Sequence, residues 1–219
     1  MKKGKLLYEG KSKRLYDTDD PELGILEFAE RLPASPAHQQ ISAKLLQILE
    51  SKGVGTHFEK SVSEREMLVK RMKMIPVEVT IRNRAAGGMV KQFGIEEGTG
   101  LACPVYELHY KSDPVADSLI NEYHLLALKI ATEDELKVMR ERSLQVNNIL
   151  RPFFEERGLE LIDFQLEFGR SRGKILLGDE ISPATCRLWE IKTGKKFDKD
   201  RFQAELFGEA EAVYQRVLK

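Results

Sequence analysis

The sequence predicts an α+β fold with two lobes. The first third of its 219 residues is rich in strand-like segments, and the remainder mixes strands with amphipathic helical patterns. A globular chain of this length buries roughly 70% of its unfolded surface, enough for one large core or two smaller lobes that share an interface. We place the boundary near residues 74–77, which gives an N-terminal lobe over residues 1–75 and a mixed C-terminal lobe over residues 76–219.

The N-terminal lobe is expected to form a small antiparallel sheet with one helix. Residues 5–28 are predicted to form a hairpin, because β-prone segments flank the turn-forming residues 19–21. Residues 31–40 hold two prolines and small polar residues, so we expect a loop. Apolar residues then recur at helical spacing from Ile41, and Gly53 is a good helix stop. Two further short strands are predicted over residues 56–62 and 66–72.

The C-terminal lobe is expected to combine strands and helices. A β-prone run over residues 77–82 leads into a glycine-rich bend and a short helix, an order that gathers backbone N–H groups around a point suited to an anion. Residues 101–123, with two prolines, are expected to be irregular. A long helix is predicted after Thr132, because Glu135 completes a capping box. The chain then continues with a hairpin of strands 160–168 and 174–182, and a helix from about residue 198.

Composition restricts the function classes. The chain has 35 Lys and Arg against 35 Asp and Glu, so its formal net charge is zero, which argues against a general nucleic-acid binder. No apolar run approaches the roughly 18 residues of a membrane-spanning helix, and the N-terminus lacks an apolar signal core, so we expect a cytoplasmic protein without a membrane partner. Cys103 and Cys186 are too few for a disulfide scaffold and have no CxxC partner for zinc.

Acidic residues on the second predicted hairpin are candidates for a metal site. Glu167 and Asp179 lie on adjacent antiparallel strands and face each other if the register allows. Like charges placed opposite one another destabilise a sheet by up to roughly 1 kcal/mol, so this pair calls for a counter-charge. Mg²⁺ would supply one, since it is typically held by one or two carboxylates plus substrate phosphates. The alternative is that Asp163, Glu167, Asp179 and Glu180 alternate onto a solvated face.

Two lysines near the N-terminus are candidates for an anion site. Lys11 and Lys13 alternate on a predicted strand and therefore point to one face, where a nucleotide triphosphate would relieve their repulsion. A solvated basic strand is the alternative. The tripeptide Gly10-Lys11-Ser12 is not part of a Walker loop, because Lys5 stands where that motif needs glycine.

Arginines form a third candidate group. Arg82 and Arg84 straddle Asn83 at the end of the β-prone run, and Arg187 lies just past the acid-bearing strand. Together they can supply the bidentate forks that bind phosphate or carboxylate. The four histidines show no paired metal spacing, so we expect them to be structural or exposed.

Six motifs follow one another along the chain: YEGKSKRLY, SEREMLVKRM, PVEVTIRNRAAGG, ELIDFQLEFG, LGDEISPATCRLW and DKDRF. In this order and spacing they resemble the SAICAR synthase family of purine biosynthesis, from about residue 6 to the end of the chain. The resemblance implies a kinase-like two-lobed fold with ATP in the cleft. It also implies an ATP-dependent ligase that activates the carboxylate of an imidazole ribonucleotide as an acyl phosphate and joins it to L-aspartate.

Individual roles follow from the resemblance, position by position. ATP and Mg²⁺ would be held by Lys11, Lys13, Lys70, Met72, Met74, Glu167 and Asp179, with Glu167 and Asp179 as the metal ligands. The imidazole ribonucleotide and L-aspartate would be bound by Arg82, Gly88, Lys111, Asp117, Arg187 and Lys199. Catalysis would depend on Lys13, Arg82 and Arg187. We also expect a homo-oligomer.

The chain departs from the family pattern in four places. The family has a longer glycine- and lysine-rich segment where this chain has AERLPASPAHQQ. Gly88 replaces a serine, Gln165 a lysine and Gln203 an arginine. A charge-assisted hydrogen bond contributes roughly 1.5–3 kcal/mol, so these losses could weaken binding of the usual substrates by orders of magnitude. Two alternatives therefore stay open: a paralogous ligase for a different carboxylate and amine, and a nucleotide-binding protein that has lost catalysis.

Overall fold

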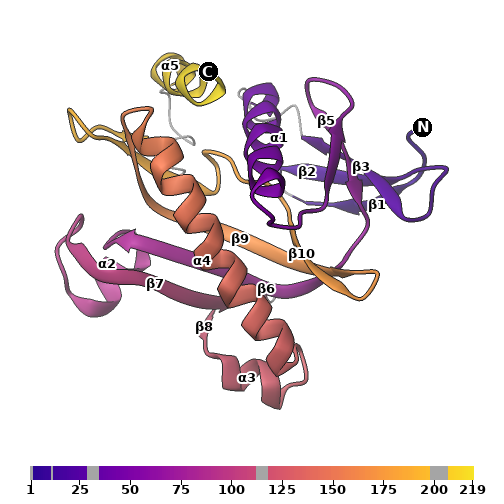
Figure 1. Cartoon of the computed structure of the whole chain (residues 1–219), viewed down its shortest axis with the longest axis horizontal. Helices are drawn as coiled ribbons and strands as arrows, with labels where there is room; N and C mark the ends of the chain where they lie inside the picture. Colours follow the sequence, from indigo (N-terminus) through magenta and orange to yellow (C-terminus); the bar gives the residue numbers. More distant parts are fainter. Residues whose placement is uncertain (1, 11, 29–34, 112–117, 198–206) are drawn as a thin grey trace.

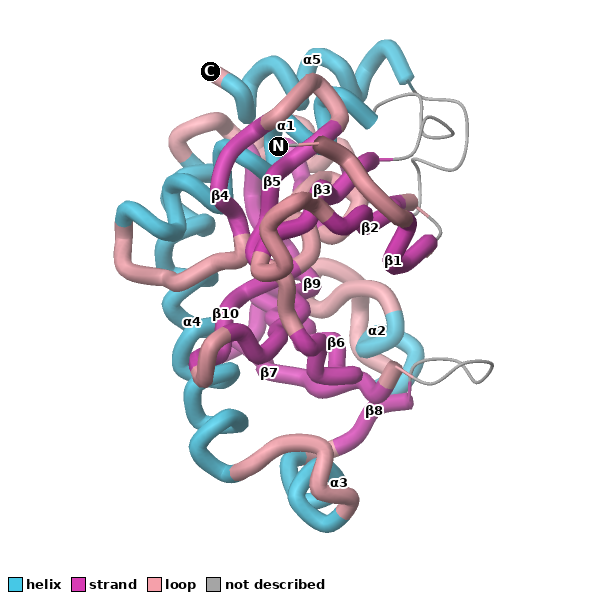
Figure 2. Tube along the Cα trace, turned by 90° about the vertical axis from the view of Figure 1, so that its right-hand side faces the viewer, coloured by secondary structure: helices cyan, strands magenta, loops and turns pink. Residues whose placement is uncertain are grey.

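The computed structural model describes residues 2–10, 12–28, 35–111, 118–197 and 207–219 (Figure 1). These residues form two antiparallel sheets with helices packed against them, which confirms the predicted α+β class. Figure 2 shows the first sheet, sheet A, stacked above the second, sheet B. The strand order is β1-β2-β3-β5-β4 in sheet A and β12-β11-β9-β6-β7-β8 in sheet B, where β10 also pairs with β9.

Sheet A contains one more strand than the sequence predicted. The segment expected as a single hairpin over residues 5–28 turns twice, first between Glu9 and Lys13 and again near residues 19–21. At the first turn the Gly10 N–H donates to the Lys13 carbonyl at 2.8 Å. Lys13 therefore opens a strand instead of lying in the middle of one. The strands are β1 Leu6–Glu9, β2 Lys13–Asp17, β3 Leu23–Phe28, β4 Phe58–Ser61 and β5 Glu66–Lys70.

Helix α1, Ser35–Ser51, covers one face of sheet A and begins earlier than predicted. Pro36 falls in its first turn, where the N–H groups have no intrahelical partner and a proline costs little. The loop predicted over residues 31–40 therefore does not extend to residue 40, because the helix already begins at Ser35. Gly53, with φ of 82°, follows the helix end as predicted.

Sheet B is built around two long strands whose alternate residues face opposite sides. On β6, Val77, Val79 and Ile81 are buried toward helix α4, and Asn83 on the same face exchanges two hydrogen bonds with Asn147 of α4 at 2.8 and 3.0 Å. The strands are β6 Lys73–Arg84, β7 Gly100–Tyr110, β8 Ser118–Ile120, β9 Leu159–Ser171, β10 Lys174–Gly178, β11 Cys186–Glu190 and β12 Lys196–Phe197.

The prediction of irregular structure over residues 101–123 was wrong. Strand β7 runs through Pro104, and β8 and the short helix α3, Glu122–Ala127, follow. Pairing between β6 and β7 is interrupted between the Arg82–Val105 and Arg84–Gly100 pairs, so Pro104 falls where a ladder N–H is not required. The short helix after the glycine-rich bend was predicted correctly and is α2, Gly88–Phe93.

The two longest described helices of the C-terminal half pack against different elements. Helix α4, Glu133–Glu155, begins with the predicted Thr132–Glu135 capping box and covers the apolar face of sheet B. Helix α5, Phe207–Leu218, instead packs on α1 (Figure 1). There the Tyr214 hydroxyl lies 3.0 Å from Nε2 of His38. The division into residues 1–75 and 76–219 stays a prediction. Among the described residues, no helix has the length and apolarity needed to cross a membrane.

Candidate functional site

The side of sheet B that faces away from α4 is lined with polar groups, and we call it the polar face. Cross-strand neighbours in the ladder place these side chains in rows, for example Arg82 beside Asp163 and Thr80 beside Gln165. Alternation along three adjacent strands thus gathers charged groups on one surface. The polar face consists of Glu78, Thr80 and Arg82 of β6, Glu107 and His109 of β7, and Asp163, Gln165 and Glu167 of β9.

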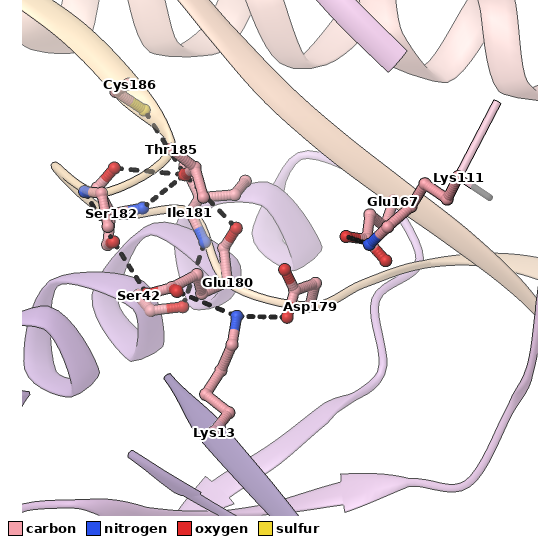
Figure 3. A network of polar contacts seen from close by, with 11 residues as sticks. Lys13, Ser42, Lys111, Glu167, Asp179, Glu180, Ile181, Ser182, Thr185 and Cys186 are labelled. Carbon is pink, nitrogen blue, oxygen red and sulfur yellow. Dashed lines mark hydrogen bonds and ion pairs between the residues drawn. The ribbon is translucent and has the colours of Figure 1, made fainter. Parts of the chain in front are cut away.

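A group of five charged residues, the carboxylate cluster, lies at one end of the polar face (Figure 3). Its ion pairs join the two sheets, because Lys13 from β2 contacts both Asp179 and Glu180 in the segment after β10. The Lys13 ammonium lies 2.9 Å from Glu180 Oε1. The Lys111 ammonium, one residue after β7, lies 2.5 Å from Glu167 Oε1.

The register places Glu167 and Asp179 near each other, but not as an opposed pair. Glu167 stands opposite Gly178, the last residue of β10. Asp179 follows with a φ of 57°, a left-handed conformation that turns the chain out of the ladder. The expectation that the two acids face each other across the strands is therefore corrected. Asp179 is nevertheless close enough to influence the ionisation of Glu167.

Charge in the carboxylate cluster is unbalanced. Burial and the Asp179 carboxylate raise the pKa of Glu167 above its ordinary value, and Lys111 only partly offsets them. Burial also acts against ionisation of Asp179 and Lys13, but their mutual attraction prevails: the pKa of Asp179 is lowered and that of Lys13 is raised. Three carboxylates therefore face two ammonium groups.

This donor set fits Mg²⁺. Glu167 and Asp179 offer carboxylate oxygens, the ligands that Mg²⁺ prefers, and the cluster has one negative charge in excess. In the part of the chain that the structure describes, no three His, Cys, Asp or Glu side chains are arranged to hold a metal. A bound Mg²⁺ would therefore take its remaining ligands from substrate phosphates and water.

Burial contradicts the alternative of a solvated acidic face for two of its four residues. Asp163 is 1% exposed and Glu180 is 5% exposed. Sequence reasoning did not assign Glu180 to the site, although it follows Asp179 directly in the GDEISP motif. The alternation of polar residues could not show that the chain turns inward after β10 and buries the second acid.

A second group, the arginine cluster, consists of Arg82, Glu107, Asp163 and Arg187 on four neighbouring strands. Arg82 donates to Glu107 Oε2 at 2.8 Å and to Asp163 Oδ2 at 2.6 Å. Arg187 donates to both oxygens of Asp163, at 3.0 and 2.7 Å. The register explains the arrangement, since Asp163 pairs with Arg82 on one side and with Arg187 on the other. All four residues are buried.

The glycine-rich bend lies against the arginine cluster. A Cβ on Gly87 would come within 2.9 Å of the Arg187 guanidinium, and Gly87 has a φ of 57°, so both space and backbone require glycine there. Arg82 also donates to the Ala86 carbonyl at 3.2 Å. Gly88 is exposed, and a Cβ added to it would meet no atom within 4 Å.

Residues 70–74, which include three of the positions that the family resemblance assigns to ATP, divide into two environments. Met72 and Met74 lie over Gly169 and Gly178, where any added Cβ would collide with the methionine side chains. These methionines therefore sit beside the end of β10, next to Asp179. Lys70 points elsewhere: its ammonium lies 3.1 Å from Glu59 and donates to the Thr56 carbonyl at 3.2 Å.

Of the remaining positions discussed from the sequence, the structure describes one. Gln165 is described and donates from its amide to Glu78 on the neighbouring strand. Four other positions lie outside the described residues: Lys11, Asp117, Lys199 and Gln203. The structure thus brings together Lys13, Lys111, Glu167 and Asp179 at one end of the polar face, and Arg82 and Arg187 in a separate cluster.

Known proteins resemble this chain over nearly its whole length. A sequence profile described as SAICAR synthetase matches residues 6–219. The phosphoribosylaminoimidazole-succinocarboxamide synthase of Clostridium kluyveri is 43% identical over 231 aligned residues, which cover 100% of this chain and 98% of that protein. The alignment is longer than the 219 residues of this chain, so that relative has additional residues.

Solved structures give the same result. The phosphoribosylaminoimidazole-succinocarboxamide synthase from Ehrlichia chaffeensis has a TM-score of 0.91 at 38% identity and covers 97% of this chain and 96% of its own. A SAICAR synthetase (Type-2) in complex with ADP has a TM-score of 0.91 at 36% identity, with 97% of both chains covered. Sequence, fold and motif order therefore agree that this chain belongs to the SAICAR synthetase family.

Proposed function

We propose that the protein joins a carboxylated aminoimidazole ribonucleotide to L-aspartate, converting ATP to ADP and phosphate and forming SAICAR. The observation that carries the proposal is the carboxylate cluster, where two lysines and three acids from both sheets meet at the end of the polar face. A related SAICAR synthetase was solved with ADP, which supports nucleotide binding by this chain. The cytoplasmic location and the homo-oligomer stay predictions.

The nucleotide would lie between Lys13 and the two methionines. Met72 and Met74 offer an apolar surface to adenine beside the end of β10, and the Lys13 ammonium would contact the phosphates. Mg²⁺, held by Glu167 and Asp179, would neutralise phosphate charge when it is bound. When Glu167 binds the metal, the Lys111 ammonium would lose this partner and could contact the anionic substrates instead. The Lys111 side chain is 41% exposed, so it has room to move.

The chemistry requires two displacements. The ribonucleotide carboxylate attacks the γ-phosphorus of ATP, which releases ADP and leaves an acyl phosphate. The aspartate amine then attacks the acyl carbon, phosphate leaves, and the amine loses a proton. This chain would contribute mainly orientation and charge stabilisation from Lys13 and Lys111. Arg82 and Arg187 are both buried on Asp163 and lie against Ala86 and Gly87, which supports a role for the two arginines in holding the glycine-rich bend.

A coupled assay of ADP release tests the proposal. Turnover is expected only when ATP, Mg²⁺, the carboxylated ribonucleotide and L-aspartate are all present, and mass spectrometry of the product should show SAICAR. Nucleotide binding without turnover would reject the ligase and favour the nucleotide-binding alternative.

A paralogous ligase is a second candidate, favoured by two described positions. Gly88 carries no hydroxyl, and Gln165 donates to Glu78 where the family resemblance leads us to expect a lysine. Both changes remove a group that would bind an anion. Replacing L-aspartate and the ribonucleotide in the same assay with a panel of other amines and carboxylates would reveal such a preference as faster ADP release.

A further inference from the structure

Glu180 is the most deeply buried acid of the carboxylate cluster, and both of its carboxylate oxygens are bound. One oxygen lies 2.9 Å from the Lys13 ammonium, and the other accepts a hydrogen bond from the Ser182 hydroxyl at 2.8 Å. A buried carboxylate is tolerated only when its charge is paired and its oxygens are hydrogen-bonded. Both conditions hold at Glu180.

The loop that carries Glu180 is itself fastened (Figure 3). The Ile181 N–H donates to the Ser42 hydroxyl of α1 at 3.2 Å, which ties the loop to the helix of the other layer. The Ser182 N–H donates to the Thr185 hydroxyl at 3.0 Å, and the Ala184 N–H donates to the Ser182 hydroxyl at 3.1 Å. The position of the Glu180 carboxylate is therefore determined from several directions.

Asp179, the other acid on Lys13, has a different environment. Its side chain is 26% exposed against 4% for Glu180. Asp179 lies beside Glu167, with which it would share a metal, whereas Glu180 points its second oxygen back into its own loop. The Lys13 ammonium thus has two carboxylate partners: Glu180, which the protein holds in place, and Asp179, which lies at the proposed metal site.

We propose that Glu180 is a positioning residue that holds the Lys13 ammonium for the nucleotide phosphates and leaves Asp179 available to the metal. Without Glu180, Asp179 would be the only carboxylate on Lys13, and the ammonium would compete with Mg²⁺ for it. With Glu180, Lys13 keeps a counter-charge when Asp179 binds elsewhere. The inference rests on the proposed function, because it presumes a nucleotide and a metal at this site.

A double-mutant cycle on ADP affinity tests the inference. Calorimetric titration with ADP and Mg²⁺ is expected to show at least a tenfold loss of affinity in Glu180→Gln, about the effect of losing one charge-assisted hydrogen bond. Lys13→Met should lose at least as much. The double variant should bind ADP as Lys13→Met does, because Glu180 acts only through Lys13. A residue with a merely structural role would lower affinity further in the Lys13→Met background.

Two further variants complete the experiment. Glu122→Gln removes another ion-paired acid, 2.5 Å from Arg140 and outside the proposed site, and should change ADP affinity less than twofold. Ser182→Ala keeps the Glu180 charge but removes its second hydrogen bond, so affinity should fall by a smaller factor. If Glu180→Gln does not fold, Ser182→Ala replaces it in the double-mutant cycle with Lys13→Met.

The failure of this inference is distinguishable from that of the proposed function. If the losses from Glu180→Gln and Lys13→Met multiply while the wild-type protein binds ADP, the positioning role is overturned and the ligase proposal stands. Wild-type ADP binding without turnover overturns the ligase proposal alone. A wild-type protein that does not bind ADP overturns both.

Discussion

The carboxylate cluster and the arginine cluster stand on the same side of sheet B, yet the fold neutralises only one of them. In the arginine cluster two guanidinium groups face two carboxylates, and every member is buried. In the carboxylate cluster two ammonium groups face three carboxylates, and Lys111 and Asp179 are partly exposed. The difference fits a rigid arginine cluster, and it supports the proposal that the carboxylate cluster receives a cation.

The largest expected effect comes from Asp179→Asn. If the carboxylate cluster holds Mg²⁺, this variant should lose roughly 10²–10³-fold in ADP release, about the effect of removing one group that stabilises transition-state charge. Its free energy of unfolding should stay within about 1 kcal/mol of wild type, because Lys13 keeps Glu180 and the variant loses the repulsion between Asp179 and Glu167. Addition of Mg²⁺ and ADP should raise the melting temperature of the wild type but not of the variant. Full activity in Asp179→Asn would show that the carboxylate cluster does not hold a metal needed for the reaction.

The matched change in the other cluster is Asp163→Asn. This variant leaves Arg82 and Arg187 buried without the carboxylate they share, so the free energy of unfolding should fall by about 3–5 kcal/mol. Urea unfolding monitored by circular dichroism measures the loss. An Asp163→Asn protein as stable as wild type would show that the arginine cluster is not the rigid one of the pair.

A fall in pH should destabilise the arginine cluster and stabilise the carboxylate cluster. Burial acts to raise the pKa of Glu107, but hydrogen bonds from His109 and Arg82 outweigh it and lower that pKa below its ordinary value of 4.5. The stability that Glu107 contributes is therefore present above about pH 4.5 and lost as the pH falls below it. The raised pKa of Glu167 has the reverse effect, since protonation removes a buried charge and relieves its repulsion from Asp179.

Urea titrations from neutral to acidic pH measure this difference. Glu107→Gln should be less stable than wild type at neutral pH and should lose less stability as the pH falls. Parallel curves for the two proteins would mean that Glu107 does not take part in acid unfolding.

The smallest expected effect belongs to Gly88→Ser. The added side chain has open space and lies in the first turn of α2, where serine is well tolerated, so the fold should be unchanged. The restored hydroxyl should strengthen binding of a phosphate-bearing substrate by about five- to tenfold, the value of one hydrogen bond. The KM for the ribonucleotide in the ADP-release assay is the measurement. An unchanged KM would show that the glycine-rich bend does not bind the substrate phosphate.

Several elements could be predicted because their signals are local. The capping box at Thr132 and Glu135 marked the start of α4, and the glycine-rich bend marked α2. Strand β7 could not be predicted in the same way, because Pro104 is tolerated only through an interrupted pairing with β6, which depends on tertiary structure. The split of the first hairpin at Gly10 was missed for a similar reason, since β-prone residues continue on both sides of the turn.

The candidate site was predictable in its charges but not in its burial. Lys13, Glu167 and Asp179 were singled out by residue type and spacing, and they lie in one cluster. Glu180 was missed because its burial depends on the left-handed turn at Asp179 and on Ser42 from another helix. Such contacts between distant segments leave no periodic trace in the sequence.

The packing of α5 on α1 has a consequence for the order in which the protein can mature. A ribosome synthesises α1 well before the segment that contains Tyr214. Until that segment emerges, His38 has no Tyr214 hydroxyl beside it, and the Lys44 ammonium cannot reach the Leu218 carbonyl, which it contacts at 2.7 Å in the finished protein. The first layer of the molecule is therefore completed only after all the described strands of sheet B have been synthesised.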